Sequence, residues 1–413
     1  MPHLSNFIPK AYYNGRLRRP LGNLERLYYE DNKNLPGMVL LSCKKNLEPC
    51  HVKDALNILV SRHPMMRMSV RNRNGVLQFI EMYNVPVDVN IINSNDWDSL
   101  LDHELRPYDQ NGPLWRFVWL QSKFNTDNHL FQFLLSVHHC ISDFPYSYLI
   151  IMEFLDILKS LQNGSDIVKI EHLFPLPIEE IVTPNANMSN THPVLKEDTV
   201  ISALKAYEHY YIKEIIFLGN KTRIPGISVW RALDNETSEC FPTTCKSKSV
   251  TNTSAILAAS IISFCNLLHR KGCRDIVRLE YSFATNLRRY MENSEPFFPG
   301  LAVVVCPVSL DVDVGATSSL GKNFWRLANT ITKQLLQTVV NDRKPVDVLH
   351  NDIANALKYD RKKGKTEIVF RLSNVESVNR LEIENNKNCQ LLDFQFKDDV
   401  EVDHCVIFQV LSH

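Results

Sequence analysis

The chain of 413 residues has no excess of either charge, because 46 Lys and Arg residues balance 46 Asp and Glu residues. Proteins that hold a nucleic-acid backbone usually carry a clear basic excess, and disordered chains combine a high net charge with few aromatic residues. This sequence instead contains 20 Phe, 14 Tyr and 5 Trp residues. The composition therefore favours a folded protein and argues against nucleic acid as a partner.

Cysteines and long hydrophobic runs are also scarce. The ten Cys residues include no C-x-x-C pair, so we expect reduced thiols, no disulfide scaffold and no metal site. The N-terminal segment lacks the apolar core of a signal peptide, and no apolar run reaches the roughly 18 residues that span a membrane. We expect a monomeric, cytoplasmic protein, and leave open a peripheral association with lipid membranes.

The length is about two to three times that of one typical domain. Helical and strand patterns alternate in both halves, which predicts an α/β (α+β) fold built from layers. Residues 164–195 contain four prolines and a polar run from Asn185 to His192, as is typical of a linker. We therefore predict an N-terminal domain of residues 1–163, a linker of residues 164–195 and a C-terminal domain of residues 196–413.

Apolar periodicity and turn residues predict the main elements of each half. In the first half they predict a helix that stops at Pro64, a β-hairpin around Asn72–Gly75, two buried strands at 114–120 and 130–137, and a helix at 144–161 that ends at Asn163–Gly164. In the second half they predict helices at about 196–217 and 322–340, and strands at 276–283, 301–310, 366–372 and 402–410. They also predict a helix that starts after Thr251 or Thr253 and ends at Arg270–Gly272.

The segment from Val137 to Asp143, with the sequence VHHCISD, stands above the background of chance patterns. It lies where a predicted buried strand leads into a predicted helix, a junction that can hold side chains rigidly. An imidazole that titrates near neutrality can take a proton from an alcohol, amine or thiol as this group attacks a carbonyl carbon. We therefore assign His139 as the candidate general base, with His138 in support.

Asp143 has more than one possible role. Its carboxylate could hold the imidazole, or it could pair with an arginine and brace the loop; we favour the second role. The alternative is purely structural, with two histidines at the end of a strand and Asp143 as the N-cap of the next helix.

The segment resembles the His-His-x-x-x-Asp-Gly motif of the chloramphenicol-acetyltransferase-like superfamily. This superfamily includes condensation domains of peptide synthetases, polyketide-associated acyltransferases and fungal alcohol acetyltransferases. Four other segments resemble further motifs of the family in the same order along the chain: Arg62–Arg67, Gly112–Arg116, Asn286–Arg289 and Ser373–Val375.

The resemblance implies two domains of similar fold, each a mixed β-sheet flanked by helices, with a tunnel between them. A thioester donor, acyl-CoA or an acyl-carrier thioester, would enter from one face, and an alcohol or amine acceptor from the other. His139 would be the catalytic base and Asp143 a structural carboxylate, with Arg288 as its salt-bridge partner and Arg67 as the alternative. The acyl group would pass directly, without a metal or a tightly bound cofactor.

Phe144 departs from the family motif, which has glycine at this position, and its ring could narrow the tunnel as a gate. Two alternatives to an acyltransferase therefore stay open. One is a catalytically silent relative that binds a lipid or an acyl-thioester, and the other is a hydrolase of esters or thioesters. The basic run Arg361–Lys365 is either a solvated loop or a contact for the phosphates of coenzyme A.

Overall fold

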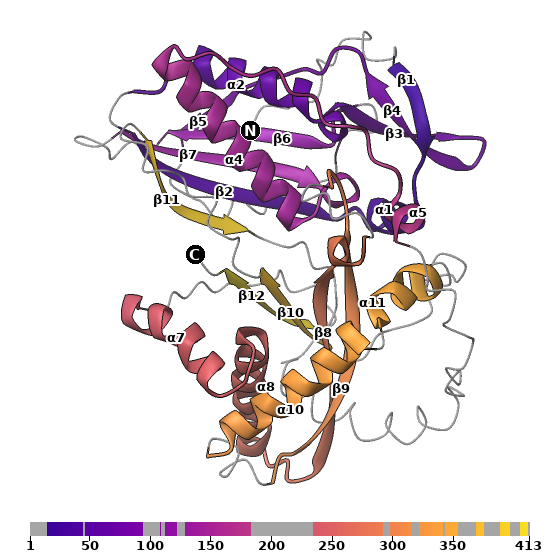
Figure 1. Ribbon diagram of the computed structural model, residues 1–413, viewed down its shortest axis with the longest axis vertical. Helices are drawn as coiled ribbons and strands as arrows, with labels where there is room; N and C mark the ends of the chain where they lie inside the picture. The colour runs from indigo at the N-terminus through magenta and orange to yellow at the C-terminus, as the bar shows by residue number, and fades with distance from the viewer. Residues whose placement is uncertain are drawn as a thin grey trace.

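Two lobes, one above the other, make up the computed structural model (Figure 1). It describes residues 15–43, 46–93, 108, 112–121, 129–182, 234–291, 298–315, 322–341, 343–353, 369–375, 389–396 and 405–411. The helix predicted at 196–217 and the basic run Arg361–Lys365 lie outside the described residues.

The first lobe is built on a five-stranded sheet in the order β11-β2-β7-β6-β5. Its strands are β2 (Asn34–Cys43), β5 (Asn90–Asn93), β6 (Trp115–Gln121), β7 (His129–His138) and β11 (Cys389–Phe396). The sheet is mixed, because β5 runs parallel to β6 while the other neighbours are antiparallel. Helices α2 (Pro49–Arg62) and α4 (Phe144–Asn163) lie side by side across it (Figure 1).

Helix α4 begins and ends where its sequence dictates. Asp143 is the N-cap, since its side chain accepts a hydrogen bond from the backbone N–H of Tyr146 at 3.1 Å, and such caps satisfy a donor that has no partner within the helix. Gly164 ends the helix with a φ of 63°, in the left-handed region that glycine adopts without steric cost. The prediction for 144–161 is confirmed.

A three-stranded sheet in the order β1-β4-β3 completes the first lobe. It consists of β1 (Gly15–Pro20), β3 (Met68–Arg73) and β4 (Val76–Met82), and it is accompanied by helix α1 (Asn23–Glu30) and the 3-10 turn η2 (Pro64–Arg67). The predicted hairpin joins β3 to β4, and both turn residues have positive φ, 54° at Asn74 and 83° at Gly75. Such Asn-Gly turns match the twist of antiparallel strands.

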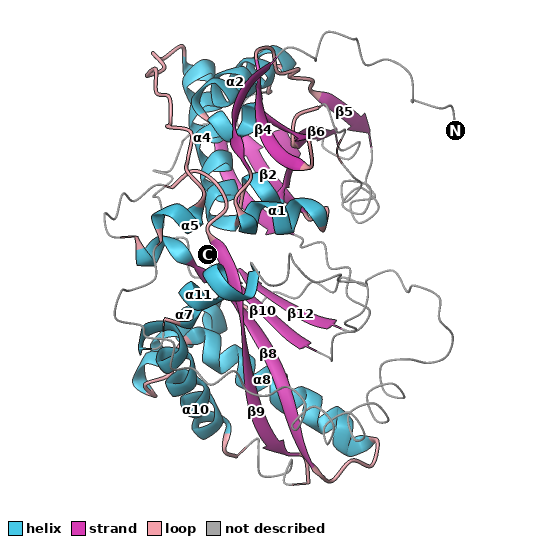
Figure 2. Cartoon of the chain, turned by 90° about the vertical axis from the view of Figure 1, so that its right-hand side faces the viewer, coloured by secondary structure: helices cyan, strands magenta, loops and turns pink. Residues whose placement is uncertain are grey.

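The second lobe contains a four-stranded mixed sheet in the order β12-β10-β8-β9 (Figure 2). Its strands are β8 (Ile276–Asn286), β9 (Val303–Asp313), β10 (Val369–Val375) and β12 (Cys405–Leu411). Its helices are α7 (Asn235–Ser247), α8 (Asn252–Arg270), α10 (Phe324–Leu336) and the short α11 (Lys344–Asp347); the short α5 (Ile178–Ile181) precedes them on the chain.

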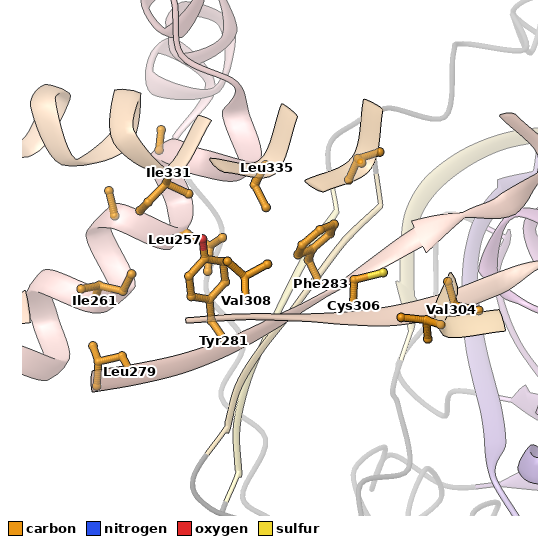
Figure 3. Close-up of a cluster of buried hydrophobic side chains, with 14 of the residues drawn as sticks. Leu257, Ile261, Leu279, Tyr281, Phe283, Val304, Cys306, Val308, Ile331 and Leu335 are labelled. Carbon is orange, nitrogen blue, oxygen red and sulfur yellow. The ribbon is translucent and has the colours of Figure 1, made fainter. Parts of the chain in front are cut away.

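The core of the second lobe forms where helices α8 and α10 pack on strands β8 and β9. Figure 3 shows Leu257 and Ile331 from the two helices above Tyr281 and Phe283 of β8. By length and composition alone α8 is apolar enough to cross a membrane, with a mean hydropathy of 1.2. Half of that stretch is buried in this core.

One strand of the first sheet comes from the far end of the chain. β11 pairs antiparallel with β2, so the part of the chain beyond the predicted linker contributes to the first lobe. The predicted division into residues 1–163 and 196–413 did not include a strand of the second segment that joins the sheet of the first lobe. The sequence of β11, CQLLDFQF, does not indicate which strand β11 will pair with.

The cysteines differ in one respect from the expectation. Seven described cysteines are free thiols: Cys50, Cys140, Cys240, Cys245, Cys265, Cys273 and Cys306. Cys43, however, is disulfide-bonded, so the prediction of reduced thiols throughout is wrong at this position. Cys43 ends β2, and its partner in backbone register on β11 is Cys389.

Candidate active site at the border of the two lobes

The predicted catalytic segment forms a strand, a tight turn and a helix in succession. His138 ends β7, the 3-10 turn η3 (His139–Ile141) follows, and α4 begins after Asp143. The exposed fractions of His138, His139 and Asp143 are 2%, 8% and 0%. The strand and the helix therefore hold all three side chains in a largely dry environment.

The imidazole of His139 is fixed by neighbours on two sides. Its Nδ1 lies 2.8 Å from the carbonyl oxygen of Ser142. A carbonyl oxygen can only accept a hydrogen bond, so Nδ1 carries the proton and Nε2 of the neutral ring carries the lone pair. The ring of Tyr28 on α1 packs against the imidazole with ring centroids 4.1 Å apart, and the backbone N–H of His139 donates to the carbonyl oxygen of Lys33 at 2.7 Å.

His138 has the opposite arrangement. Its Nδ1 accepts a hydrogen bond from the backbone N–H of Cys140 at 3.1 Å, so it caps the turn that presents His139. Burial, together with the nearby His139 and Arg116, lowers the pKa of His138 to about 3. It therefore stays neutral near pH 7 and shapes the turn, as the structural alternative for the histidine pair predicts.

Asp143 accepts four hydrogen bonds and is wholly buried. Besides the N–H of Tyr146, its donors are Arg288 Nη1 at 2.8 Å, Arg288 Nη2 at 3.1 Å and the backbone N–H of Ala302 at 2.8 Å. Asp143 is thus both the N-cap of α4 and one half of a bidentate ion pair with the second lobe. It does not orient the His139 ring, whose Nδ1 is bound to Ser142.

Arg288 lies in the 3-10 turn η4 (Leu287–Tyr290) of the second lobe. Besides Asp143, its guanidinium contacts the carbonyl oxygens of Phe298 and Gly300 at 3.1 and 2.8 Å. The side chain of Asn286 accepts the backbone N–H of Arg288 and shapes the turn. A bidentate pair between arginine and carboxylate fixes direction as well as distance, so this contact sets how the two lobes meet.

Arg67, the alternative partner for Asp143, lies elsewhere. Its guanidinium binds Glu81 at 2.8 Å and Glu171 at 2.9 Å, and it also donates to the carbonyl oxygens of Val60 and Ser61. It therefore links α2 to β4 within the first lobe. The partner of Asp143 therefore comes from the segment Asn286–Arg289, and not from the segment Arg62–Arg67.

Phe144, the predicted gate, is the first residue of α4 and is buried in the hydrophobic core of the first lobe. Its ring stacks on that of Tyr148, one turn later, with centroids 6.2 Å apart and planes at 21°. The described contacts of the ring are thus those of a core residue.

Of the remaining motif segments, Gly112–Arg116 contacts the end of β7 and is in turn bound to Arg62–Arg67, while Ser373–Val375 lies on a strand of the second lobe. The indole Nε1 of Trp115 donates to the carbonyl oxygen of Met66 at 2.8 Å, and the N–H of His138 donates to the carbonyl oxygen of Leu114 at 2.8 Å. Ser373–Val375 ends β10, the parallel neighbour of β8, which leads to Arg288. Tyr28 and Lys33 were not predicted, since one contributes a ring face and the other only a carbonyl group.

Part of the first lobe is similar in sequence to known proteins. Residues 30–172 match the protein family described as Condensation domain. A stretch of 135 residues is 30% identical to surfactin synthase subunit 2 of Bacillus subtilis (strain 168). This match covers 30% of the chain and 4% of that protein, so the chain corresponds to a small part of a much longer relative.

Solved structures match over nearly the whole chain. Polyketide synthase associated protein 5 from Mycobacterium tuberculosis has a TM-score of 0.66 and 13% identity, covering 96% of this chain and 91% of that one. TRI3 trichothecene 15-O-acetyltransferase from Fusarium sporotrichioides has a TM-score of 0.64 and 14% identity, covering 98% and 92%. The first condensation domain of the CDA synthetase has a TM-score of 0.59 and 13% identity, covering 97% and 89%. The chain therefore has the two-lobed α/β fold of the chloramphenicol-acetyltransferase-like superfamily, as its His-His-x-x-x-Asp motif predicted.

Proposed function

We propose that the protein is an acyltransferase that moves an acyl group from a thioester, of the acyl-CoA type, to an alcohol or amine, with His139 as general base. The observation that carries the proposal is the hydrogen bond between His139 Nδ1 and the carbonyl oxygen of Ser142. It puts the lone pair of the neutral ring on Nε2, which a general base requires. The condensation-domain match and the fold shared with an acetyltransferase support the reaction class.

The proposed reaction needs no covalent intermediate on the enzyme, because a thioester is already activated. Nε2 of His139 takes the proton of the acceptor O–H or N–H while the acceptor oxygen or nitrogen attacks the thioester carbon. The tetrahedral intermediate then collapses, the C–S bond breaks, and the imidazolium returns its proton to the thiolate. During the step Nδ1–H keeps its bond to Ser142, which stabilises the imidazolium.

The ion pair of Asp143 and Arg288 has a positioning role in this proposal. Three hydrogen bonds to Asp143, two from Arg288 and one from the backbone of Ala302, tie the start of α4 to the second lobe, directly beside the turn that carries His139. The donor and the acceptor would reach His139 through a tunnel between the lobes. A displacement of about 1 Å at such a site can cost two orders of magnitude in rate.

A catalytically silent binding protein is the second candidate function. The departure of Phe144 from the family motif favours it, while the packing of this ring in the core of the first lobe favours the acyltransferase. The bulky ring stands where the family motif has glycine, at the first residue of α4. In this case the protein would bind a lipid or an acyl-thioester at the same border without turnover. Replacing Phe144 by Gly would then produce or increase acyl transfer.

The direct test is a panel of acyl-CoA donors with alcohol and amine acceptors, in which release of free thiol is followed with and without acceptor. His139→Ala is compared with His51→Ala, a histidine on α2 far from the motif in the chain, after circular dichroism has shown that both variants fold. We expect His139→Ala to lower the rate by about 100-fold or more and His51→Ala to leave it unchanged.

Other outcomes of the panel would replace the proposal. Thiol release that is independent of acceptor assigns the protein as a hydrolase. Binding of the thioester without thiol release assigns it as a silent relative. Wild-type transfer by His139→Ala would show that another group is the base.

A further inference from the structure

A second group of potential ligands lies outside the acyl-transfer site. His63 follows the last residue of α2, Glu153 lies on α4, and His172 lies in the segment after α4. His63 Nε2 is 3.3 Å from Glu153 Oε2, and His172 Nε2 is 3.1 Å from Glu153 Oε1. One ligand atom from each residue lies within 4.8 Å of the other two.

These separations match the edge of a metal coordination polyhedron. Zinc binds imidazole nitrogen and carboxylate oxygen at about 2.0 to 2.2 Å, and in a tetrahedron such ligand atoms are about 3.3 Å from each other. Each imidazole nitrogen lies about this far from one carboxylate oxygen, 3.3 Å from Oε2 for His63 and 3.1 Å from Oε1 for His172. Because one ligand atom from each residue lies within 4.8 Å of the other two, rotations of these side chains would bring all three to bonding distance of one ion. Two histidines and one glutamate are also a ligand set that zinc uses when one coordination position stays open to water.

Neighbouring groups hold the ligands in place. Nδ1 of His63 lies 3.1 Å from the hydroxyl of Tyr146 on α4. A second hydrogen bond of this kind orients most histidines that bind metals. His172 is held by its backbone N–H, which donates to the carbonyl oxygen of Arg62 at 2.8 Å.

The charges of the group also suit a cation. Glu153 is the acidic member of the group, and its two carboxylate oxygens face the two imidazoles at 3.3 and 3.1 Å. Carboxylate oxygen and imidazole nitrogen are both ligands that zinc uses. Arg62 Nη1 lies 3.2 Å from Glu153 Oε2. Its positive charge lowers the affinity of the group for a cation, but its contact is with Oε2 and leaves Oε1 to His172.

The group is reachable from solvent. The side chain of His63 is fully buried, while those of Glu153 and His172 are 20% and 18% exposed. An ion would therefore enter from the side of Glu153 and His172. Its effect would be to fasten the segment after α4 onto α2 and α4.

We propose that His63, Glu153 and His172 form a binding site for a divalent transition metal ion of the zinc class, separate from the acyl-transfer site. The ion acts as a clamp between the end of α2, the middle of α4 and the chain that leaves the first lobe. The sequence predicted no metal because the three residues are far apart along the chain and share no motif spacing.

The test uses the full chain, stripped with a chelator and dialysed into metal-free buffer. Zinc chloride is titrated by calorimetry, and bound zinc is counted after gel filtration. We expect about one equivalent on the wild type and a higher melting temperature with zinc, because binding to the folded state stabilises it. Glu153→Gln and His172→Ala should weaken binding by at least about tenfold and lose the rise in melting temperature.

Two controls exclude other zinc ligands. His51→Ala removes a histidine of α2 outside the group and should bind zinc as the wild type does. Substitution with Co²⁺ reports thiolate ligands by a sulfur-to-metal charge-transfer band, which a site of two histidines and one glutamate does not give. That band also separates binding at the free cysteines from binding at this site.

Three outcomes would overturn the proposal. They are a wild type that binds no zinc, equal affinity in the wild type and both ligand variants, or a cobalt spectrum with thiolate bands. Glu153→Gln keeps the side-chain volume, so it stays informative if His172→Ala does not fold. Acyl transfer is measured separately, so the failure of either proposal leaves the other standing.

Discussion

Helix α4 carries one carboxylate network at its start and a second one near its middle, and the two connect different parts of the molecule. Asp143 reaches across to Arg288 and Ala302 of the second lobe. Glu153 binds His63 and His172 within the first lobe. One helix thus joins the lobes at its first turn and holds its own lobe together two to three turns later.

The two networks also differ in how many donors surround the carboxylate. Asp143 has no exposed surface and accepts four hydrogen bonds from α4 and the second lobe. Glu153 remains partly exposed and faces two imidazoles and one guanidinium. The first arrangement is a closed structural contact, whereas the second keeps access to solvent, as an ion-binding site requires.

Breaking the contact at the start of α4 should have the largest effect on stability. Arg288→Met keeps the apolar stem but leaves Asp143 buried without its ion pair, and removal of one partner of a buried pair costs about 3 to 5 kcal/mol. Urea denaturation followed by circular dichroism measures the loss.

Two variants calibrate that result. Asp143→Asn retains an N-cap, because Asn caps helices as well as Asp, so its loss reports the ion pair apart from the cap. Arg26→Ala removes an exposed pair with Glu30 on α1 and should cost only about 0.3 to 0.5 kcal/mol. Equal losses for Arg288→Met and Arg26→Ala would contradict a bracing role for Arg288.

The neutral His138 makes the start of α4 sensitive to acid. Its pKa is about 3 in the folded protein against the ordinary histidine value of 6.5, so between these pH values the unfolded chain binds a proton that the folded one does not. Its contribution to stability is complete above pH 6.5 and is lost as the pH falls from 6.5 toward 3, at up to about 1.4 kcal/mol per pH unit.

His138→Asn should flatten this dependence. The Asn side-chain oxygen can accept the N–H of Cys140 in place of Nδ1, but it does not titrate. The difference between the two stability curves over pH 7 to 4, measured by urea denaturation, should correspond to about one proton. Parallel curves would assign the acid sensitivity to other groups.

The sequence predicted the first network far better than the second. His139 and Asp143 lie within seven residues at a strand-to-helix junction, and Arg288 follows from a short segment typical of the same family. The long helices α2, α4, α8 and α10 and eight of the twelve strands in the described residues were also predicted, because their periodicity is local. Helices α1 and α7 and strands β1, β2, β5 and β11 were not predicted. The pairing of β11 with β2 was not predicted, since the sequence of β11 does not specify a partner strand more than 300 residues away.

What was missed depends on tertiary structure. Tyr28 contributes a ring face to His139, and Lys33 contributes a backbone carbonyl; neither group has a sequence signature. Glu153 comes together with His63 and His172 only after α2, α4 and the following segment have packed. The disulfide at Cys43 likewise depends on which strands become neighbours, which cysteine spacing does not reveal.

Tyr146 contacts both networks, so a substitution at this residue can test whether they act independently. Its backbone N–H donates a hydrogen bond to the side chain of Asp143, while its hydroxyl contacts His63. Tyr146→Phe removes only the hydroxyl, so the cap and the ion pair with Arg288 stay intact. We expect a loss of about 1 kcal/mol in stability from the missing hydrogen bond, and a roughly tenfold weaker affinity for zinc because His63 loses its orienting partner.

Acyl transfer by Tyr146→Phe should match that of the wild type, since no contact of His139 changes. Measuring the transfer rate, zinc affinity and stability on this one variant tests whether α4 carries two independent networks. A fall in the transfer rate in parallel with the zinc affinity would mean that the middle of α4 controls its first turn, and the clamp at His63 would then act on the catalytic turn through Tyr146.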